Sequence, residues 1–388
     1  MKKGEMVIIK IFLSVIIIMC SCTNNKINYN VQNKIYFDTK LSVKNFDLKG
    51  IIDSAVTIIP LETRDDCLIS RIDKLEIVDD RIYIQDILAQ SIFIFDINGK
   101  FIDKLKRLGQ GPGEYVNLSY MTVTDSTIIV VDHYARKQLE YSKNSLKFLR
   151  NVGDINTIWC TDIFSLSKNL YYINNWSDSK SGKYRLFAKK TGVDDIAKYL
   201  PFKKEPLALG LSGNKYGVFG NAASVIYDGD DYIYRIKENR VYPEFEMIYK
   251  NEKVVYTSGE VENVYKENSD DRVLGINSIN ESEKYLFLHM SLTGNNNYTC
   301  IYNKHDSTTI IYTSLAINSY LDDEGVNVMK IINNQVIDWR DAYNLFVLKK
   351  YVYSNKEFKN QKYKKQLDML FQDLKEDSNP VLFIYDLI

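Results

Sequence analysis

The sequence predicts an all-β fold, a six-bladed β-propeller built from four-stranded antiparallel blades. Three observations support this prediction: a composition that favours strands, a repeat of 46 residues, and the length of chain over which repeat-like segments recur. Strands are favoured because Tyr is frequent (29 residues) and Pro is scarce (6 residues) in this chain of 388 residues. Hydrophobic residues make up 45% of the chain, which is sufficient for a large buried core.

The repeat is clearest in the first half of the chain. Residues 75–86 align without a gap on residues 121–132, so Asp132 follows Asp86 by 46 residues. Each unit contains a strand, an Asp-centred turn, a strand that ends in Asp, a short polar link and a third strand. In the first unit, Asn98-Gly99 then predicts a hairpin into a fourth strand. Four short antiparallel strands in about 40 to 50 residues are typical of a propeller blade.

Strand-like segments that diverge from the first two units continue to about residue 345. Measured from Val56, they cover about 290 residues, and units of about 46 residues then give about six blades. One amphipathic helix is expected before Pro380, because apolar residues such as Leu367 and Leu370 recur at helical spacing. The last strand, Val381–Tyr385, is expected to share a blade with the strand that begins at Val56, since this closure removes two exposed sheet edges.

The amino terminus predicts export and lipid attachment. Basic residues precede the apolar run Ile11–Met19, which is shorter than the roughly 20 residues that span a bilayer. Cys22 follows the small Ser21, as in the lipobox of bacterial lipoproteins, and Cys20 is a competing site. Residues 1–21 are therefore interpreted as a lipoprotein signal peptide, 22–50 as a lipidated tether and 51–388 as the propeller. An ordinary secretory signal and an uncleaved anchor are the alternatives, and the residue after Cys22 favours the outer membrane over the inner one.

Four short segments carry a family resemblance: residues 59–63, 109–115, 232–236 and 379–382. In them the chain resembles the six-bladed β-propeller lipoproteins of Bacteroides-type bacteria, within the broader TolB-like and NHL-like propellers. The resemblance implies a propeller fold and a location in the cell envelope. It implies no reaction, because the family is largely without assigned activity.

The residues that could face a ligand lie where the first two units end their second strands. Asp86 and Asp132 end matching strands, and each either points toward a ligand or caps a turn by accepting backbone N–H groups. The loop Gly109–Tyr115 is expected at the same face, where Pro112-Gly113 suits a type II turn and where both inter-blade packing and ligand contact are open. The candidates for the ligand-binding face are Asp86, Glu114, Tyr115, Asp132, His133 and Arg136.

No metal site or cofactor is predicted. None of the three histidines has metal-ligand spacing, and Asp228–Asp231 resembles a calcium loop that lacks its final Glu, since Asn239 stands there. Calcium remains an alternative, because some six-bladed propellers hold it in the central channel. Gly210–Gly213 does not fit the nucleophile elbow of serine hydrolases.

Charge and motifs together favour a binding module of the envelope. Lys plus Arg (50) balance Asp plus Glu (50), so the chain lacks the positive field that nucleic-acid binding requires. The expected partners are the membrane, through the N-terminal lipid, and an unidentified glycan, peptide or envelope protein. The alternative is a metal-dependent hydrolase or lyase that uses carboxylates in the propeller channel. Catalysis therefore stays an open question, and a non-catalytic module is favoured.

Overall fold

The computed structural model describes residues 29–43, 46–48, 50–154, 160–175, 183–190, 195–202, 213–254, 272–293, 297–313, 317–318, 328–351, 353, 358 and 360–388. The chain divides into a segment Met1–Asn30 and a compact unit Val31–Ile388, which holds all the described strands and helices. The predicted signal peptide and both candidate lipidation sites, Cys20 and Cys22, lie outside the described residues.

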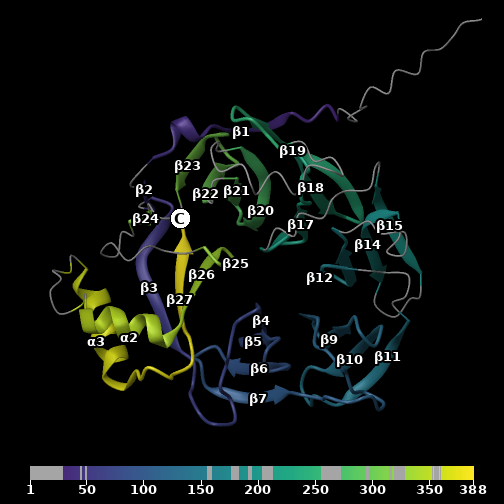
Figure 1. Ribbon diagram of the computed structural model, residues 1–388, viewed down its shortest axis with the longest axis vertical. Helices are drawn as coiled ribbons and strands as arrows, with labels where there is room; N and C mark the ends of the chain where they lie inside the picture. Colours follow the sequence, from purple (N-terminus) through teal and green to yellow (C-terminus); the bar gives the residue numbers. More distant parts are fainter. Residues whose placement is uncertain are drawn as a thin grey trace, which may run out of the picture. The chain divides into compact units, whose positions relative to one another are not determined.

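Six antiparallel sheets, each with four blade strands, form a ring around a central axis (Figure 1). From inner to outer strand, blade 1 is β4 (Lys74–Val78), β5 (Arg81–Asp86), β6 (Ser91–Asp96) and β7 (Phe101–Leu105); blade 2 is β8 (Tyr120–Val123), β9 (Thr127–Asp132), β10 (Lys137–Ser142) and β11 (Phe148–Asp154); blade 3 is β12 (Asp162–Leu166), β13 (Asn169–Ile173), β14 (Tyr184–Lys190) and β15 (Ile196–Pro201). Blade 4 is β16 (Tyr216–Phe219), β17 (Ala222–Val225), β18 (Tyr232–Lys237) and β19 (Arg240–Tyr249); blade 5 is β20 (Val273–Glu281), β21 (Tyr285–Leu292), β22 (Asn297–Asn303) and β23 (Thr309–Thr313); blade 6 is β25 (Lys330–Ile332), β26 (Gln335–Arg340), β27 (Val381–Leu387) and β3 (Ile52–Pro60). The predicted six-bladed propeller is confirmed.

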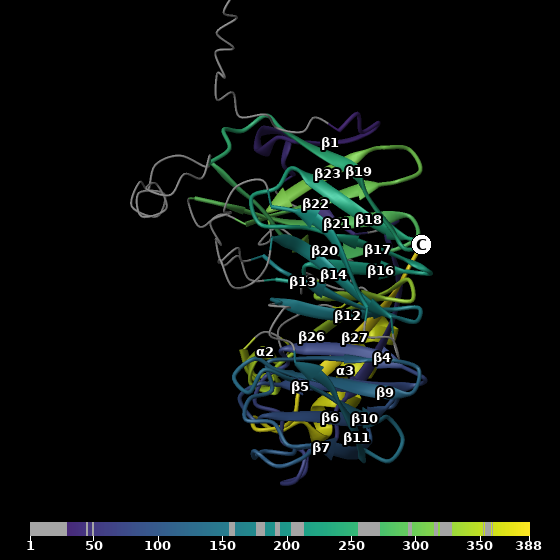
Figure 2. The ribbon, with the colours of Figure 1, turned by 90° about the vertical axis from the view of Figure 1, so that its right-hand side faces the viewer.

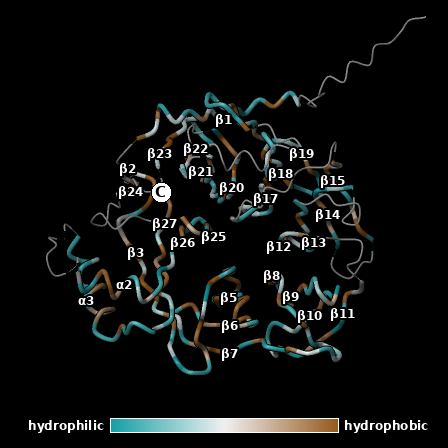
Figure 3. The backbone as a smooth tube through the Cα atoms, in the orientation of Figure 1, coloured by the Kyte–Doolittle hydropathy of each residue, from teal (hydrophilic) through white to brown (hydrophobic). Residues whose placement is uncertain are grey.

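The blades pack face to face, so their middle strands are buried on both sides. In β9 all six residues are buried, and in β5 only Arg81 is not. Hydrophobic segments accordingly recur along the strands around the ring in Figure 3. Figure 2 shows that the strands run across the short dimension of the ring. We call the face at which the inner strands begin the entry face; the links between consecutive blades also lie there.

The ring closes through strands from both ends of the chain. β27 pairs with β3 in antiparallel register, Val381 opposite Pro60 and Tyr385 opposite Val56. On its other side β27 pairs with β26. The predicted closure is thereby confirmed, and the sixth blade combines three strands from the C-terminal part of the chain with one from the N-terminal part.

Residues 33–43 and 46–47, which we call the strap, belong to the propeller and not to a tether. Its first strand, β1 (Asn33–Phe37), extends blade 4 by pairing in parallel with β19, and the side chains of Ile35 and Phe37 are buried. Its last strand, β2 (Phe46–Asp47), pairs with β24 (Ile317–Asn318). The structure thus corrects the expected boundary at residue 51, because backbone pairing and two buried apolar side chains attach the segment to the outside of the ring (Figure 1).

Two helices follow blade 6's second strand. The second, α3 (Gln361–Asp373), is the predicted amphipathic helix, and it buries Tyr363, Leu367, Leu370 and Phe371. The first, α2 (Ala342–Tyr351), was not expected; it buries Ala342 and Leu345, and the half-buried Leu348 packs against the same core. In the described part of the chain, neither helix has the length and apolar character needed to cross a membrane.

Candidate functional site: the mouth of the central channel

The inner strands of five blades each begin with a residue that reaches the centre of the channel. These first residues are Lys74 of β4, Tyr120 of β8, Asp162 of β12, Tyr216 of β16 and Lys330 of β25. They share this position because consecutive blades repeat the same strand order around the ring. The fold therefore gathers two lysines, an aspartate and two tyrosines that are far apart in the sequence.

A cavity of about 570 Å³ opens at the entry face of the channel, and all six blades contribute to its wall. Polar side chains form much of this wall, among them Asn277 and Ser278 in the middle of β20 of blade 5. The half-buried rings of Tyr120 and Trp339 add aromatic surface. The wall therefore offers hydrogen-bond donors, acceptors and aromatic faces to one bound molecule.

A second cavity, of about 420 Å³, lies on the other side of the channel centre. Apolar side chains such as Val123, Phe164 and Ile331 form much of its wall. Lys330 lines both cavities. The side chains around Lys330 therefore separate a polar cavity from a more apolar one.

A network of charged side chains forms this separation. The Lys74 ammonium lies 3.1 Å from Asp162 Oδ1 and 3.5 Å from Glu76 Oε1, and it donates to the Ile163 carbonyl at 2.5 Å. The Lys330 ammonium donates to Asn214 Oδ1 at 3.1 Å and lies 4.2 Å from the centre of the Tyr216 ring.

Burial and neighbouring charges shift the pKa values of these groups in different directions. Burial and the adjacent Lys74 ammonium lower the pKa of Lys330 to about 8, although Asp162 and Glu76 oppose this effect. Burial also acts to lower the pKa of Lys74, but Asp162, Tyr216 and Glu76 together outweigh it and the pKa of Lys74 is raised. Burial raises the pKa of Tyr216, which stays a neutral phenol. Lys74 is thus a fixed cation, whereas Lys330 titrates near neutral pH.

The two aspartates predicted at the ligand face are buried turn caps. Asp86 Oδ2 accepts from the backbone N–H groups of Ser70 (2.6 Å) and Arg71 (3.2 Å), and its Oδ1 accepts from the next turn. Asp132 Oδ2 accepts from the residues at the equivalent positions of the next blade, at 2.6 and 3.2 Å. Each carboxylate joins its own blade to the link that precedes it, as the capping alternative expected.

The loop Gly109–Tyr115 lies between blades 1 and 2 at the entry face. Gly113 has a φ of +73°, and the Glu114 N–H donates to the Gly111 carbonyl at 3.1 Å, which is the geometry of the expected type II turn. The Glu114 carboxylate accepts from the Gly111 N–H at 2.8 Å. Tyr115 is fully buried between the blades, donates to the Gln90 carbonyl at 2.9 Å, and burial raises its pKa to about 12.

His133 and Arg136 occupy the turn that follows β9. The His133 ring is half-buried, 5.0 Å from the Tyr120 ring, and its Nε2 lies 3.5 Å from the buried thiol of Cys160. Burial lowers the pKa of His133, although Asp132 opposes this effect. Arg136 is exposed, with a φ of +54°. The wall of the channel cavity includes none of the six predicted residues, which lie in or near the links between blades.

Sequence reasoning missed the residues that do line the channel. The aligned repeat begins at Leu75 and Met121, and Lys74 and Tyr120 stand one position before it. Extending the alignment by one residue would have found these two. The equivalent residues of blades 3, 4 and 6 lie in units too diverged to align.

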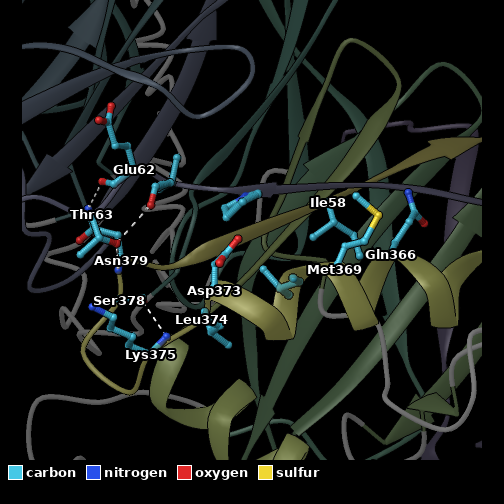
Figure 4. Close-up of a pocket in the computed structure, with 13 residues that line it drawn as sticks. Ile58, Glu62, Thr63, Gln366, Met369, Asp373, Leu374, Lys375, Ser378 and Asn379 are labelled. Atoms are coloured by element: carbon cyan, nitrogen blue, oxygen red, sulfur yellow. Dashed lines mark hydrogen bonds between the residues drawn. The ribbon is translucent and has the colours of Figure 1, made fainter.

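Another hollow, of about 640 Å³, lies outside the ring between α3 and the end of β3 (Figure 4). Its most connected polar residue, Asn379, donates to the Glu62 and Cys67 carbonyls at 2.7 and 2.8 Å and receives a bond from the Ile69 N–H. Asn379 therefore fastens the last strand to the chain that leaves β3. Segments 59–63 and 379–382, two of the four that carry the family resemblance, meet through these hydrogen bonds of Asn379.

Comparisons with known proteins identify the family but no activity. No curated protein matches the chain. Two solved structures share the fold. A predicted exported protein of Bacteroides fragilis has a TM-score of 0.69 at 17% identity, over 92% of this chain and 99% of its own. A member of the DUF4221 family from Bacteroides vulgatus has a TM-score of 0.50 at 11% identity, over 87% of this chain and 97% of its own. The model of the family named Domain of unknown function (DUF4934) matches residues 23–386, and the chain therefore belongs to that family.

Proposed function

We propose that this chain is a lipid-anchored protein of the cell envelope that binds a short glycan, without catalysis, in the cavity at the entry face of the channel. The observation that supports this proposal most directly is the amide of Asn277 in the cavity wall. Its Nδ2 donates to Ser291 Oγ at 2.9 Å, whereas its buried Oδ1 has no hydrogen-bond partner among the described residues. An unsatisfied buried acceptor is costly, and a hydroxyl group of a ligand would satisfy it.

The rest of the wall suits a hydroxyl-rich ligand. Asn214, Ser278 and Lys330 bring donors and acceptors from three blades, and Trp339 offers an aromatic face to the apolar side of a sugar ring. A volume of about 570 Å³ is in the range of small-ligand sites. A propeller supplies these groups on rigid strands, so little is lost in ordering them on binding.

The carboxylates near the channel centre support binding over catalysis. Asp162 Oδ1 accepts from Lys74 and from the Ile163 N–H at 2.8 Å, and Glu76 Oε2 accepts from the Val123 N–H at 2.8 Å. Groups held in this way act as fixed partners of Lys74. The hydrolase or lyase alternative would need at least one of them free to exchange a proton with a substrate.

The envelope location rests on the lipobox-like Cys22 and on the name of the structural neighbour from Bacteroides fragilis. With two or three acyl chains on Cys22, membrane attachment would be firm. Mass spectrometry of the mature protein should find an acylated Cys22 at its amino terminus. A Cys22→Ala protein that fractionates with membranes like the wild type would contradict this part of the proposal.

Calorimetric titration of residues 31–388 with neutral and acidic oligosaccharides tests the binding function. Asn277→Ala and Trp339→Ala should each weaken binding about tenfold or more, because a tenfold change corresponds to roughly one lost hydrogen bond or stacking contact. Asn169→Ala is the matched control, since its amide donates to Asn239 in the exposed turn between β18 and β19, away from the cavity. Absence of saccharide binding, or equal binding by all three variants, would contradict the proposal.

A further inference from the structure

The geometry points to a carboxylate-binding position at the bottom of the entry-face cavity, where the Lys330 ammonium binds the carboxylate of an acidic sugar at the end of the ligand. This inference rests on the proposed glycan-binding function and adds the chemical class of the ligand.

Lys330 differs from the two other lysines buried near the channel. Lys74 is paired with Asp162, and Lys215 is paired with Asp228 at 2.7 Å. None of the ion pairs in the described part of the chain includes Lys330. Its ammonium has the neutral amide oxygen of Asn214 and the face of Tyr216 as partners. Among the described residues, the channel therefore contains one lysine ammonium that forms no ion pair with a carboxylate.

The carboxylates close to Lys330 are already used. Asp162 is held by Lys74 and a backbone N–H group, and Glu76 is held by the Val123 N–H. These partners hold both carboxylates in place, and neither forms an ion pair with Lys330 in the described part of the chain. A desolvated cation without a counter-ion is unfavourable, and an anion delivered by a ligand removes that cost without disturbing the network.

The position of Lys330 also determines which sugar of a bound glycan it would contact. Lys330 lines both cavities, so it lies at the depth where the central network divides them. A sugar chain that entered from the polar cavity could not continue past Lys74, Tyr216 and Lys330. The sugar that carries the carboxylate is therefore a terminal residue of the ligand.

Binding of a carboxylate is coupled to the protonation of Lys330. The titratable groups around it are Lys74 and Glu76 of β4, Asp162 of β12, Tyr216 of β16 and the half-buried His289 of β21. With the pKa of free Lys330 at about 8, the amine is protonated below that pH and binds the anion. An opposite charge raises the pKa of the amine in the complex. Affinity is accordingly full below about pH 8 and falls as pH rises above it, by up to about tenfold per pH unit.

The experiment compares a disaccharide that ends in glucuronate with its neutral glucose counterpart by calorimetry between pH 6.5 and 9.5. At about pH 6.5 the wild type should prefer the acidic disaccharide by about tenfold or more, and the preference should decline above about pH 8. Lys330→Met should abolish the preference, so that the variant binds the acidic and the neutral disaccharide with affinities within about threefold of each other. Lys168→Met, at an exposed lysine of the turn between β12 and β13, should behave like the wild type.

Each result decides the matter. Equal binding of the two disaccharides by the wild type overturns the carboxylate position and leaves the proposed glycan-binding function standing. Failure of both disaccharides, with binding of a peptide that ends in Glu, overturns both. If Lys330→Met does not fold, Lys330→Gln and the pH profile of the wild type carry the test, and an acidic preference that is constant to pH 9.5 contradicts the role of Lys330.

Discussion

The junction between blades 1 and 2 and the junction between blades 4 and 5 are held by different chemistry. At the first, Asp132 accepts backbone N–H groups of the link that enters blade 2, as Asp86 does for blade 1. At the second, Arg235 of β18 reaches across to Glu281 of β20 with two hydrogen bonds of 2.9 and 2.7 Å, and Lys304 binds the same carboxylate at 2.9 Å. The Glu281 side chain is 0% exposed.

This difference explains why the aspartate cap recurs in the sequence and the ion-pair cluster does not. An aspartate that binds backbone N–H groups works with any neighbouring side chains, so the same residue can serve two blades at a spacing of 46 residues. The cluster of Arg235, Glu281 and Lys304 needs three matched side chains from two blades. The aspartate caps therefore appear in the sequence as a repeat, whereas the ion-pair cluster produces no repeated pattern.

The largest effect is expected where removal of one group leaves buried charges. Glu281→Ala removes the carboxylate that Arg235 and Lys304 share, and should lower the free energy of unfolding by about 3 to 5 kcal/mol. Urea denaturation followed by tryptophan fluorescence measures it. A loss below about 1 kcal/mol would show that the junction of blades 4 and 5 does not depend on the cluster.

Glu281→Gln separates charge from shape at the same position. Burial acts to raise the pKa of Glu281, but Arg235 and Lys304 outweigh it and the pKa is lowered below its ordinary value of 4.5. The stabilisation is therefore present above about pH 4.5 and is lost as pH falls through the lower folded-state pKa. The wild type should lose stability more steeply than Glu281→Gln in this acidic range, and equal slopes would contradict the assignment.

A smaller effect is expected at the repeated caps. Asp132→Ala leaves three part-buried backbone N–H groups without their acceptor and should cost about 2 to 4 kcal/mol. Asp86→Ala should cost the same within about 0.5 kcal/mol, because its three hydrogen bonds match in place and length. The exposed Asp125→Ala is the control. If the two substitutions lowered the free energy of unfolding by different amounts, the caps of blades 1 and 2 would not be equivalent.

The smallest effect concerns the link between blades 1 and 2. Gly113 (φ +73°) and Gly50 (φ +85°) share a backbone conformation that disfavours other residues, but a Cβ at Gly113 would overlap Phe148 whereas one at Gly50 meets nothing within 4 Å. Gly50→Ala should therefore cost about 1 kcal/mol and Gly113→Ala about 2 to 3 kcal/mol. Thermal denaturation of both variants measures the difference. Equal melting temperatures would contradict close packing of the loop on blade 2.

Local signals predicted much of the fold. The turn at Asn98-Gly99, where Gly99 has a φ of +84°, and the strand at Val381 could be found because each depends on a few neighbouring residues. β1 was missed since Ile35 and Phe37 are its only buried side chains, and its pairing with β19 involves the backbone. The channel residues were missed for a different reason. Lys74, Asp162 and Lys330 meet only because the ring closes, and no local pattern marks such a meeting.

The pairing of the N-terminal strands β1 and β3 with strands much later in the chain sets an order on assembly during synthesis. The strap is among the first described parts of the chain to be made, but β1 cannot pair until β19 exists, and Thr39 meets Asn251 across 212 residues. β3 must wait still longer, for β27 at the very end of the chain. Blades 1 to 3 use only strands that are adjacent in sequence, so they can form early. β1 and β3 are thus made long before their partners, and the ring cannot close before β27 has been synthesised.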